Sequence, residues 1–499
     1  MQMKWVRRVL CTLIPLCLSA QDLKEFEKKV TEFTLGNGLH FIILRRTEAP
    51  VASMVAYVNV GSANDPAGKT GLAHMLEHMA FKGTETLGTT NWPEEKKWLA
   101  DIEAIYDKLD NEKNKGPRGS QETINKLQAE VKAAIEKANS YVDKEAYSKV
   151  IQQNGGVGMN AGTSTESTVY FYSLPSNRVE LWFLLTSQVF REPIMREFYK
   201  ERDVVREERR MRVESNPQGK MVDALMTTSY LAHPQRQIVG WASDIENLRA
   251  KDSTAFFRQY YVPSNMVMVI AGDVDPVEMK RLAAQYFAPM RTGPAPPRVI
   301  TEEPRQEGER RSFIETPSQP MLLMGYKRPP GTDPDDAPLT VLARALASGR
   351  TGILYKELVE QKRIALAAAA SENFAGNKYP GLFFMYSLPA VEKTNEENEK
   401  AMLEIVGRMK KEKLSEAVLK RVKTKVRADL IRSLDSNMGM ARQLAAAYML
   451  FGDWRKLFTQ IEEVDKVTAD DVERVARTYL IDSARTVVSS KAPEKGAAK

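Results

Sequence analysis

The pattern of apolar and polar positions in the N-terminal part of the chain predicts a small sheet followed by a helix. Alternating or continuous runs of β-branched and apolar residues predict three neighbouring antiparallel strands, at residues 30–35, 40–44 and 51–60. Gly36, Asn37 and Gly38 form a turn signal between the first two of these strands. A polar loop then leads into residues 71–81, whose apolar spacing predicts a helix.

Charged residues and alanines dominate residues 92–150, where apolar residues recur with helical spacing. They form two groups, and the spacing within each predicts an amphipathic helix: Ile102, Ile105 and Leu109, then Ile124, Leu127, Val131 and Ile135. Gly116, Pro117, Arg118 and Gly119 interrupt the helical pattern between the groups. We interpret residues 92–150 as an inserted helical hairpin. A partner-binding arm is one alternative, and a solvated insertion is the simpler one.

The remaining pattern predicts a duplicated α+β unit. Strand-like sequence at 158–174 precedes two helical stretches, at 178–190 and 197–213. A helix at 251–261 and a strand at 266–272 match a helix at 470–479 and a strand at 485–489. An offset of 218 places Asp252 on Asp470, Tyr261 on Tyr479 and Val269 on Val487.

Residues 289–311 are rich in Pro, Arg and Glu and have little periodicity, so we expect a linker there. The fold class is therefore α+β, with two homologous domains at 21–288 and 312–499. Each domain is expected to be an antiparallel-rich sheet packed with helices.

The first twenty residues have the pattern of a secretory signal peptide. Basic Lys4, Arg7 and Arg8 precede an apolar run at 9–18, which is too short to span a bilayer. We expect cleavage near Ala20; an uncleaved membrane anchor, or lipidation of Cys17, is the alternative.

Cys11 and Cys17 both lie in this segment, so the mature protein is expected to have no thiol and no disulfide, which suits the periplasm or the medium. Cleavage removes three bases and lowers the net charge from +7 to about +4. The signs are interspersed, so we expect neither a nucleic-acid partner nor a stable membrane anchor.

His74, Glu77 and His78 carry the chemical signal of the chain, because positions i, i+3 and i+4 share one face of a helix. With 4 histidines and 65 acids in 499 residues, chance would give roughly 0.003 such H-x-x-acid-H matches. A catalytic zinc site needs a third protein ligand and one open position. Only His40 and His233 remain as other histidines, which favours a carboxylate, but spacing alone does not choose among the acids.

Several sequence blocks resemble the pitrilysin (inverzincin) family of zinc metallopeptidases, which includes mitochondrial processing peptidase and many secreted or periplasmic bacterial enzymes. The matching blocks are residues 34–39, 71–84, 160–164, 201–208 and 263–267 with Gly272 and Asp273, and more faintly Gly325, Tyr326 and 354–367. The resemblance implies that each such chain forms half of a clamshell and hydrolyses peptides or unfolded segments.

The resemblance implies roles for particular residues. Glu208 would be the third zinc ligand, Glu201 would orient a ligand, and Glu77 would be the general base. The 92–150 hairpin explains why His78 and Glu208 are further apart than is usual in the family. Without the resemblance, Glu208 would be read as an exposed helix residue and the histidines as buried structural ones. The ligand set would also accept cobalt or manganese.

The resemblance further implies that Asn160 and Ala161 lie on a substrate-binding strand edge, although Asn160 also suits a turn after the preceding glycines. The family usually supplies an Arg and a Tyr from the C-terminal half. The aligned positions here hold Val359 and Leu366, which cannot donate hydrogen bonds from their side chains.

We therefore expect a related second chain that supplies this pair, or a homodimer. The alternatives are a non-catalytic clamshell scaffold or assembly subunit of the same family, and a zinc-binding module without turnover.

Overall fold

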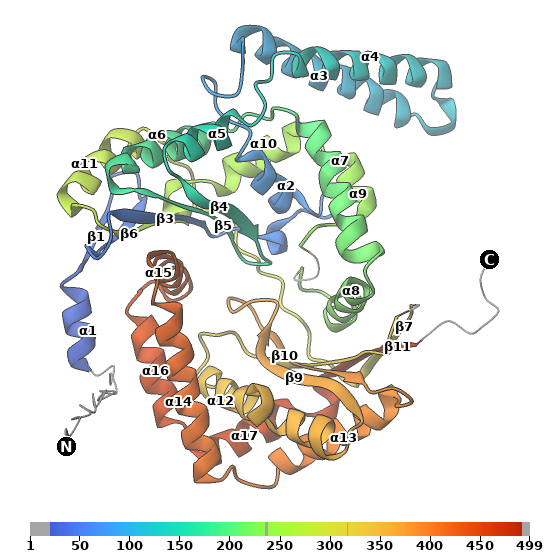
Figure 1. The fold of residues 1–499 in the computed structure, drawn as a ribbon. Coiled ribbons are helices and arrows are strands. Elements are labelled where there is room, and N and C mark those ends of the chain that lie inside the picture. The colour runs from blue at the N-terminus through green and yellow to red at the C-terminus, as the bar shows by residue number, and fades with distance from the viewer. Residues whose placement is uncertain (1–19, 235–237, 317, 492–499) are drawn as a thin grey trace, which may run out of the picture.

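The computed structural model describes residues 20–234, 238–316 and 318–491, which form two sheets with their own helices, one above the other in Figure 1. The expected signal peptide, with Cys11 and Cys17, lies outside the described residues apart from Ala20, where helix α1 (Ala20–Glu27) begins. In the described part of the chain, no helix is both long enough and apolar enough to cross a membrane.

The N-terminal sheet has six strands in the order β1-β2-β6-β3-β5-β4. They are β1 (Val30–Thr34), β2 (His40–Arg45), β3 (Val51–Val58), β4 (Val157–Thr163), β5 (Thr168–Pro175) and β6 (Met266–Gly272). The β2–β6 pair is parallel and the other pairs are antiparallel.

One detail of the sequence expectation was wrong in this sheet. The third predicted strand, β3, does not lie beside β2, because the fully buried strand β6 inserts between them. The strand-like sequence expected at 158–174 is confirmed, and it forms two strands, β4 and β5, joined by a turn.

The C-terminal sheet repeats this arrangement with five strands in the order β7-β11-β8-β10-β9. They are β7 (Arg310–Glu315), β8 (Leu322–Arg328), β9 (Ala365–Phe374), β10 (Gly381–Pro389) and β11 (Arg485–Lys491). In each sheet the strand that comes last in the sequence lies between two earlier strands and is parallel to one of them. In the first sheet β6 is parallel to β2, and in the second β11 is parallel to β7. Residues 291–309 form neither helix nor strand, and we keep 21–288 and 312–499 as proposed domain limits.

The duplication is present at an offset of 219 residues, so the expected offset of 218 was wrong by one. Helix α10 (Ala250–Tyr260) corresponds to α17 (Ala469–Tyr479), and β6 begins 219 residues before β11. Asp252 therefore corresponds to Asp471, and each accepts a backbone N–H at the start of its helix. The sequence match fits an offset of 218 as well as one of 219, because it includes adjacent identical residues such as Tyr260 and Tyr261.

The two units exchange one helix each. Helix α8 (Pro217–Ser229), from the first half, packs Met221, Leu225 and Met226 against Leu323, Leu382 and Val488 of the second sheet. Helix α15 (Asn437–Phe451), from the second half, packs against β3 and β6, beneath the upper sheet in Figure 1. Each sheet thus depends on the other half of the chain to bury one of its apolar faces.

Other helices pack on the sheets or on neighbouring helices. The N-terminal half adds α6 (Val179–Arg191), α9 (Ala242–Asn247) and α11 (Pro276–Phe287). The C-terminal half adds α12 (Asp336–Ala347), α13 (Asn395–Met409), α14 (Glu416–Ser433) and α16 (Lys456–Lys466).

The insertion forms the expected pair of helices, α3 (Trp92–Lys113) and α4 (Gln121–Asn139), which project beyond the sheet in Figure 1. Leu109, Leu127 and Val131 form a small core between them. The returning chain passes into α5 (Ala146–Gln153). At its base the hairpin is held by a buried ion pair between Glu95 and Arg196.

Candidate metal and active site

Helix α2 (Leu72–Met79) carries the histidine motif, and its start is fixed by close packing. Gly71 has a φ of 90°, and a Cβ there would lie 2.4 Å from the carbonyl oxygen of Val239. The Asp65 carboxylate accepts the Gly71 and Ala73 N–H groups at 2.7 and 2.9 Å. These bonds satisfy backbone donors that the first turn of a helix leaves unpaired.

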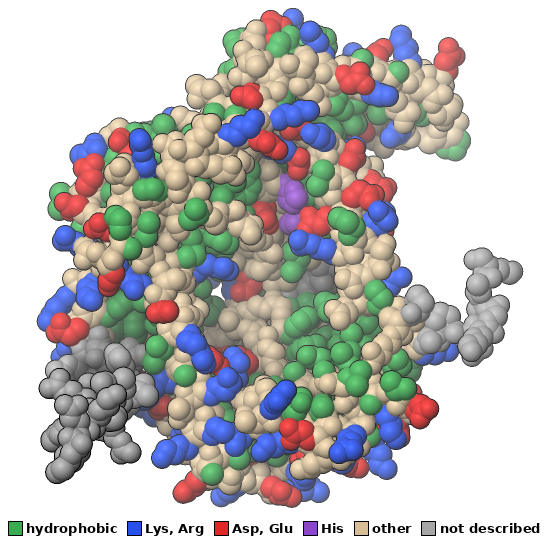
Figure 2. All heavy atoms as spheres, in the orientation of Figure 1, with side chains coloured by type: hydrophobic (Ala, Val, Ile, Leu, Met, Phe, Trp, Pro, Cys, Tyr) green, Lys and Arg blue, Asp and Glu red, His purple; other side chains and the backbone are tan. Residues whose placement is uncertain are grey.

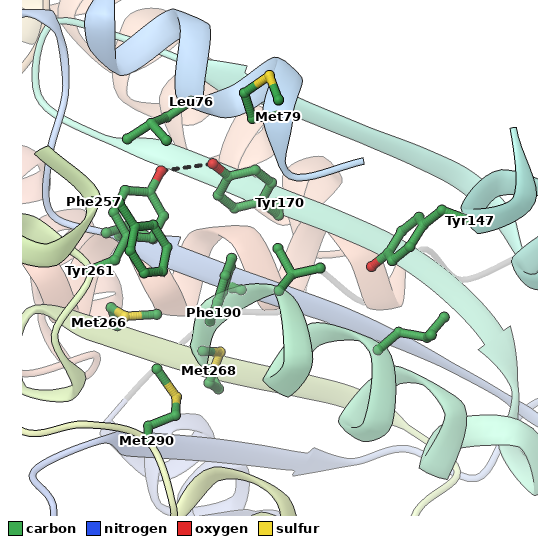
Figure 3. Packing of buried hydrophobic residues seen from close by; sticks show 14 of the residues in the cluster. Leu76, Met79, Tyr147, Tyr170, Phe190, Phe257, Tyr261, Met266, Met268 and Met290 are labelled. Atoms are coloured by element: carbon green, nitrogen blue, oxygen red, sulfur yellow. Dashed lines mark hydrogen bonds between the residues drawn. The ribbon is translucent and has the colours of Figure 1, made fainter. Parts of the chain in front are cut away.

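The inner face of α2 anchors it to the core of the N-terminal unit. Leu76 and Met79 are buried in the same cluster as Tyr170 and Tyr261, whose hydroxyls lie 2.7 Å apart (Figure 3). The positions of His74, Glu77 and His78 on this anchored helix are thereby set by packing on its opposite side.

Helix α7 (Phe198–Arg209) faces α2 and continues into one π-helical turn, Arg210–Glu214. The structure brings His74, His78 and Glu208 together, with one potential ligand atom from each lying within 4.8 Å of the others. The His74 Nε2 and Glu208 Oε1 atoms are 3.7 Å apart, and the His78 Nε2 and Glu208 Oε2 atoms are 3.4 Å apart.

This geometry fits zinc. Tetrahedral bonds of about 2.1 Å place neighbouring ligand atoms about 3.4 Å apart, close to the two separations above. Two imidazoles and one carboxylate also form a donor set that zinc accepts while keeping one position open. His40 and His233 lie elsewhere, the first stacked on Tyr448 and the second beside Tyr379.

Electrostatic contacts tie His78 to two acids. Burial by itself lowers the pKa of His78, but hydrogen bonds to Glu201 and Glu208 outweigh it and raise the pKa to about 9. His78 Nδ1 lies 3.4 Å from Glu201 Oε2, and Lys82 donates to the other Glu201 oxygen. Burial of Glu201 opposes its ionisation, yet its bonds to His78 and Lys82 lower its pKa to about 2.

His74 and Glu77 occupy drier surroundings. Burial, followed by the charge of His78, lowers the pKa of His74 to about 4. Burial raises the pKa of Glu77, although its Oε2 atom accepts a 2.6 Å hydrogen bond from the Thr163 hydroxyl. Thr163 is the last residue of β4, so this bond joins the motif helix to the strand edge.

A cavity of about 1240 Å³ opens at this point. It is lined by the motif residues and by Asn160 and Ala161, which lie on β4 at the edge of the sheet. Asn160 Oδ1 accepts the Ala161 N–H at 2.8 Å, and the two residues pair with Phe171 and Tyr170. Histidine is visible in purple on this face in Figure 2, flanked by acidic and basic side chains.

Sequence reasoning missed three polar residues of the site: Lys82, Thr163 and Arg212. Arg212 Nη1 lies 2.8 Å from Glu208 Oε1. The available signal was helical spacing, because Lys82 follows His78 by four residues and Arg212 follows Glu208 by four. Val359, in the π-helical turn Tyr355–Gln361, and Leu366, on β9, do not contribute to this cavity as the described residues define it.

Comparison with protein families gives two matches that together span most of the chain. The insulinase (peptidase family M16) model matches residues 41–100 and 131–240, and the peptidase M16 inactive domain model matches 247–426. The chain belongs to the M16 peptidase family. The resemblance to pitrilysin-type enzymes is therefore confirmed. The insulinase match omits residues 101–130, the outer part of the hairpin formed by α3 and α4.

Relatives of this M16 chain include a zinc protease, PqqE, from Helicobacter pylori, 27% identical over 481 residues that cover 95% of this chain and 95% of the relative. A probable mitochondrial-processing peptidase subunit beta from Arabidopsis thaliana is 22% identical over 471 residues, covering 91% of this chain and 77% of the relative.

Solved structures confirm the two-domain α+β fold. The crystal structure of a protease from Helicobacter pylori matches with a TM-score of 0.77 at 26% identity, covering 93% of this chain and 99% of that chain. The periplasmic protease PqqL from Escherichia coli shares the fold with a TM-score of 0.69 at 15% identity. In that case 94% of this chain corresponds to 48% of the longer one.

Proposed function

We propose that this chain is a zinc-dependent endopeptidase that hydrolyses peptides or unfolded protein segments. The observation that carries the proposal is the meeting of His74, His78 and Glu208 beside Glu77 at an open strand edge. Membership of a peptidase family and similarity to a relative named as a zinc protease support it.

Zinc bound by these three residues would activate a water molecule and polarise the scissile carbonyl group. Glu77 is the general base in this proposal: it takes a proton from the attacking water and later delivers it to the leaving amine. The Thr163 hydroxyl holds one Glu77 oxygen, which leaves the other oxygen for the water. Glu201 orients His78 through Nδ1, so that Nε2 faces the metal.

The strand edge suggests how a substrate binds. Among the described strands β4 pairs only with β5, so its other edge has main-chain groups that an extended peptide can pair with. Asn160 and Ala161 lie on this strand and line the cavity, and we assign them to substrate binding. Main-chain pairing requires an extended substrate segment, which is why peptides and unfolded segments are the proposed class.

We further propose that a second chain, related or identical, completes the active assembly in the periplasm or the medium. Val359 and Leu366 leave the C-terminal half without the expected donors. The solved structure of a periplasmic protease with the same fold is compatible with an exported protein. Val359 and Leu366 also favour the second candidate function, a non-catalytic scaffold of this family, because a scaffold has no need for these donors.

One experiment separates the two candidates. Zinc content and cleavage of a quenched peptide library are measured for the wild type, Glu77→Gln and His78→Ala, with and without a co-expressed related chain. The enzyme proposal expects cleavage by the wild type, zinc without cleavage for Glu77→Gln, and neither for His78→Ala. A zinc-loaded wild type that cleaves nothing in either condition would refute the enzyme proposal and favour the scaffold.

A further inference from the structure

Arg212 is a cation at the metal site that is only partly committed to other groups. Its Nη1 atom lies 2.8 Å from Glu208 Oε1, the same oxygen that faces His74. A guanidinium group has five N–H donors, and the described residues provide no other side-chain partner for this one. The Arg212 side chain is 68% exposed and lines the cavity, so its remaining donors face the space that a substrate would enter.

The backbone of Arg212 is held firmly, although its side chain is largely exposed. It lies in the π-helical turn, in which the Ser215 N–H donates to the Arg210 carbonyl at 2.7 Å. A Cβ on Gly219 would lie 1.8 Å from the Arg212 carbonyl oxygen, so only glycine lets the start of α8 approach this turn. The backbone of Arg212 is thus fixed beside Glu208, and the side chain extends from there to the cavity.

Arg210 provides a contrast within the same turn. It pairs with Glu207 at 2.7 Å and is 54% exposed, so its chemistry and exposure resemble those of Arg212. However, it does not line the cavity, whereas Arg212 does. If the helix only needed positive charge, Arg210 and Arg212 would serve equally well. A role in the reaction requires a residue that lines the cavity, which is Arg212.

Distances place Arg212 within reach of the reacting group. A zinc ion bound to Glu208 Oε1 at about 2.1 Å would lie no more than about 5 Å from Arg212 Nη1, which is itself 2.8 Å from that oxygen. The remaining Arg212 donors could therefore reach a substrate carbonyl oxygen that approaches the metal position from the cavity. Hydrogen-bond donors aimed at developing negative charge are a major source of rate enhancement, most of all where the bound substrate excludes water from them.

We propose that Arg212 is a catalytic residue whose guanidinium donates to the scissile carbonyl oxygen as that oxygen gains negative charge. This inference rests on the proposed peptidase function. Water adds to the carbonyl carbon, the C=O π pair moves onto oxygen, and Glu77 takes the water's proton. When the carbonyl re-forms, the C–N bond breaks and the amine receives that proton. Arg212 gives up no proton and stabilises the charge only while the oxygen carries it.

The test compares Arg212→Met with the matched control Arg210→Met in the active assembly. Zinc affinity is measured by competition with a chromophoric chelator, and kcat and KM on the best-cleaved library peptide. The dissociation constant of a phosphinic peptide of that sequence, a stable analogue of the tetrahedral intermediate, is measured by calorimetry. We expect Arg212→Met to lower kcat and weaken analogue binding, each on the order of 100-fold. Its KM and zinc affinity should stay within threefold of wild type, and Arg210→Met should match wild type throughout.

Each other result overturns the inference. Equal analogue binding by wild type and Arg212→Met would show that the guanidinium does not contact the oxyanion. Loss of zinc affinity in Arg212→Met would show that Arg212 merely supports Glu208. Equal losses in both variants would point to general charge on the helix. A zinc-loaded wild type that cleaves no peptide would instead refute the proposed function, and with it this inference.

Discussion

Replacing Glu201 with glutamine is expected to weaken zinc binding by 10- to 100-fold. Glu201 Oε2 lies 3.4 Å from His78 Nδ1, and Lys82 donates to the other carboxylate oxygen. A carboxylate in this position keeps the proton on Nδ1, so the Nε2 lone pair points towards Glu208 and the metal. Loss of such a partner typically costs 10- to 100-fold in metal affinity, or about 1.4 to 2.7 kcal/mol.

The full effect is expected because water screens this contact poorly. The Glu201 side chain is 12% exposed and that of Lys82 is 19% exposed. Glutamine keeps the shape of the side chain, so the substitution removes the charge and leaves the packing between α2 and α7 in place. The change should therefore appear in zinc affinity while the far-UV circular dichroism spectrum is unchanged.

The assay is competition for zinc with a chromophoric chelator at pH 7.5. Glu197→Gln is the matched control, because Glu197 contacts Lys82 at 3.4 Å and Lys200 at 2.8 Å but neither imidazole. We expect the control to stay within threefold of wild type. The reasoning would be refuted if Glu201→Gln also bound zinc within threefold of wild type, or if both variants lost affinity equally.

Three further substitutions test other parts of the structure. Thr163→Val removes the 2.6 Å hydrogen bond to Glu77, the proposed general base, and should lower kcat about tenfold with zinc content unchanged. Thr163→Ser keeps the hydroxyl and should keep most activity. Equal rates for the two variants would contradict this role of Thr163. Glu95→Gln leaves the buried guanidinium of Arg196 without its counter-ion and should cost ~3 kcal/mol in urea denaturation, against less than ~0.5 kcal/mol for the exposed Glu94→Gln. Burial raises the pKa of Glu166 to about 7, so the folded chain holds an extra proton there at mildly acid pH. The free energy of unfolding of the protein should therefore fall by up to ~3 kcal/mol as the pH rises from about 4.5 to about 7. Glu166→Gln should flatten this part of the plot of unfolding free energy against pH.

Local pattern predicted most strands and the helices around the histidine motif, but not most helices of the C-terminal half, nor which strands lie side by side. Residues 266–272 read as a strand from their apolar run, yet nothing near them in sequence indicates insertion between β2 and β3. The exchange of α8 and α15 has the same origin. Neither helix was predicted, and the sheet that each one packs on lies in the other half of the chain. Pairing over such distances is decided by the global fold rather than by local propensity.

The residues of the candidate site also fall into two groups, those that local spacing predicts and those that only the fold brings together. His74, Glu77 and His78 stand out because helical spacing alone puts them on one face, while Glu201 and Glu208 emerged only through the family resemblance. Thr163 gave no usable signal, and the signal for Arg212 was only its spacing of four residues from Glu208. Thr163 meets Glu77 because β4 ends beside α2, and Arg212 meets the cavity because the π-helical turn continues α7 beyond Glu208. Residues that assist metal ligands depend on how separate elements pack, so a motif can predict the metal centre and still omit the groups that complete its chemistry.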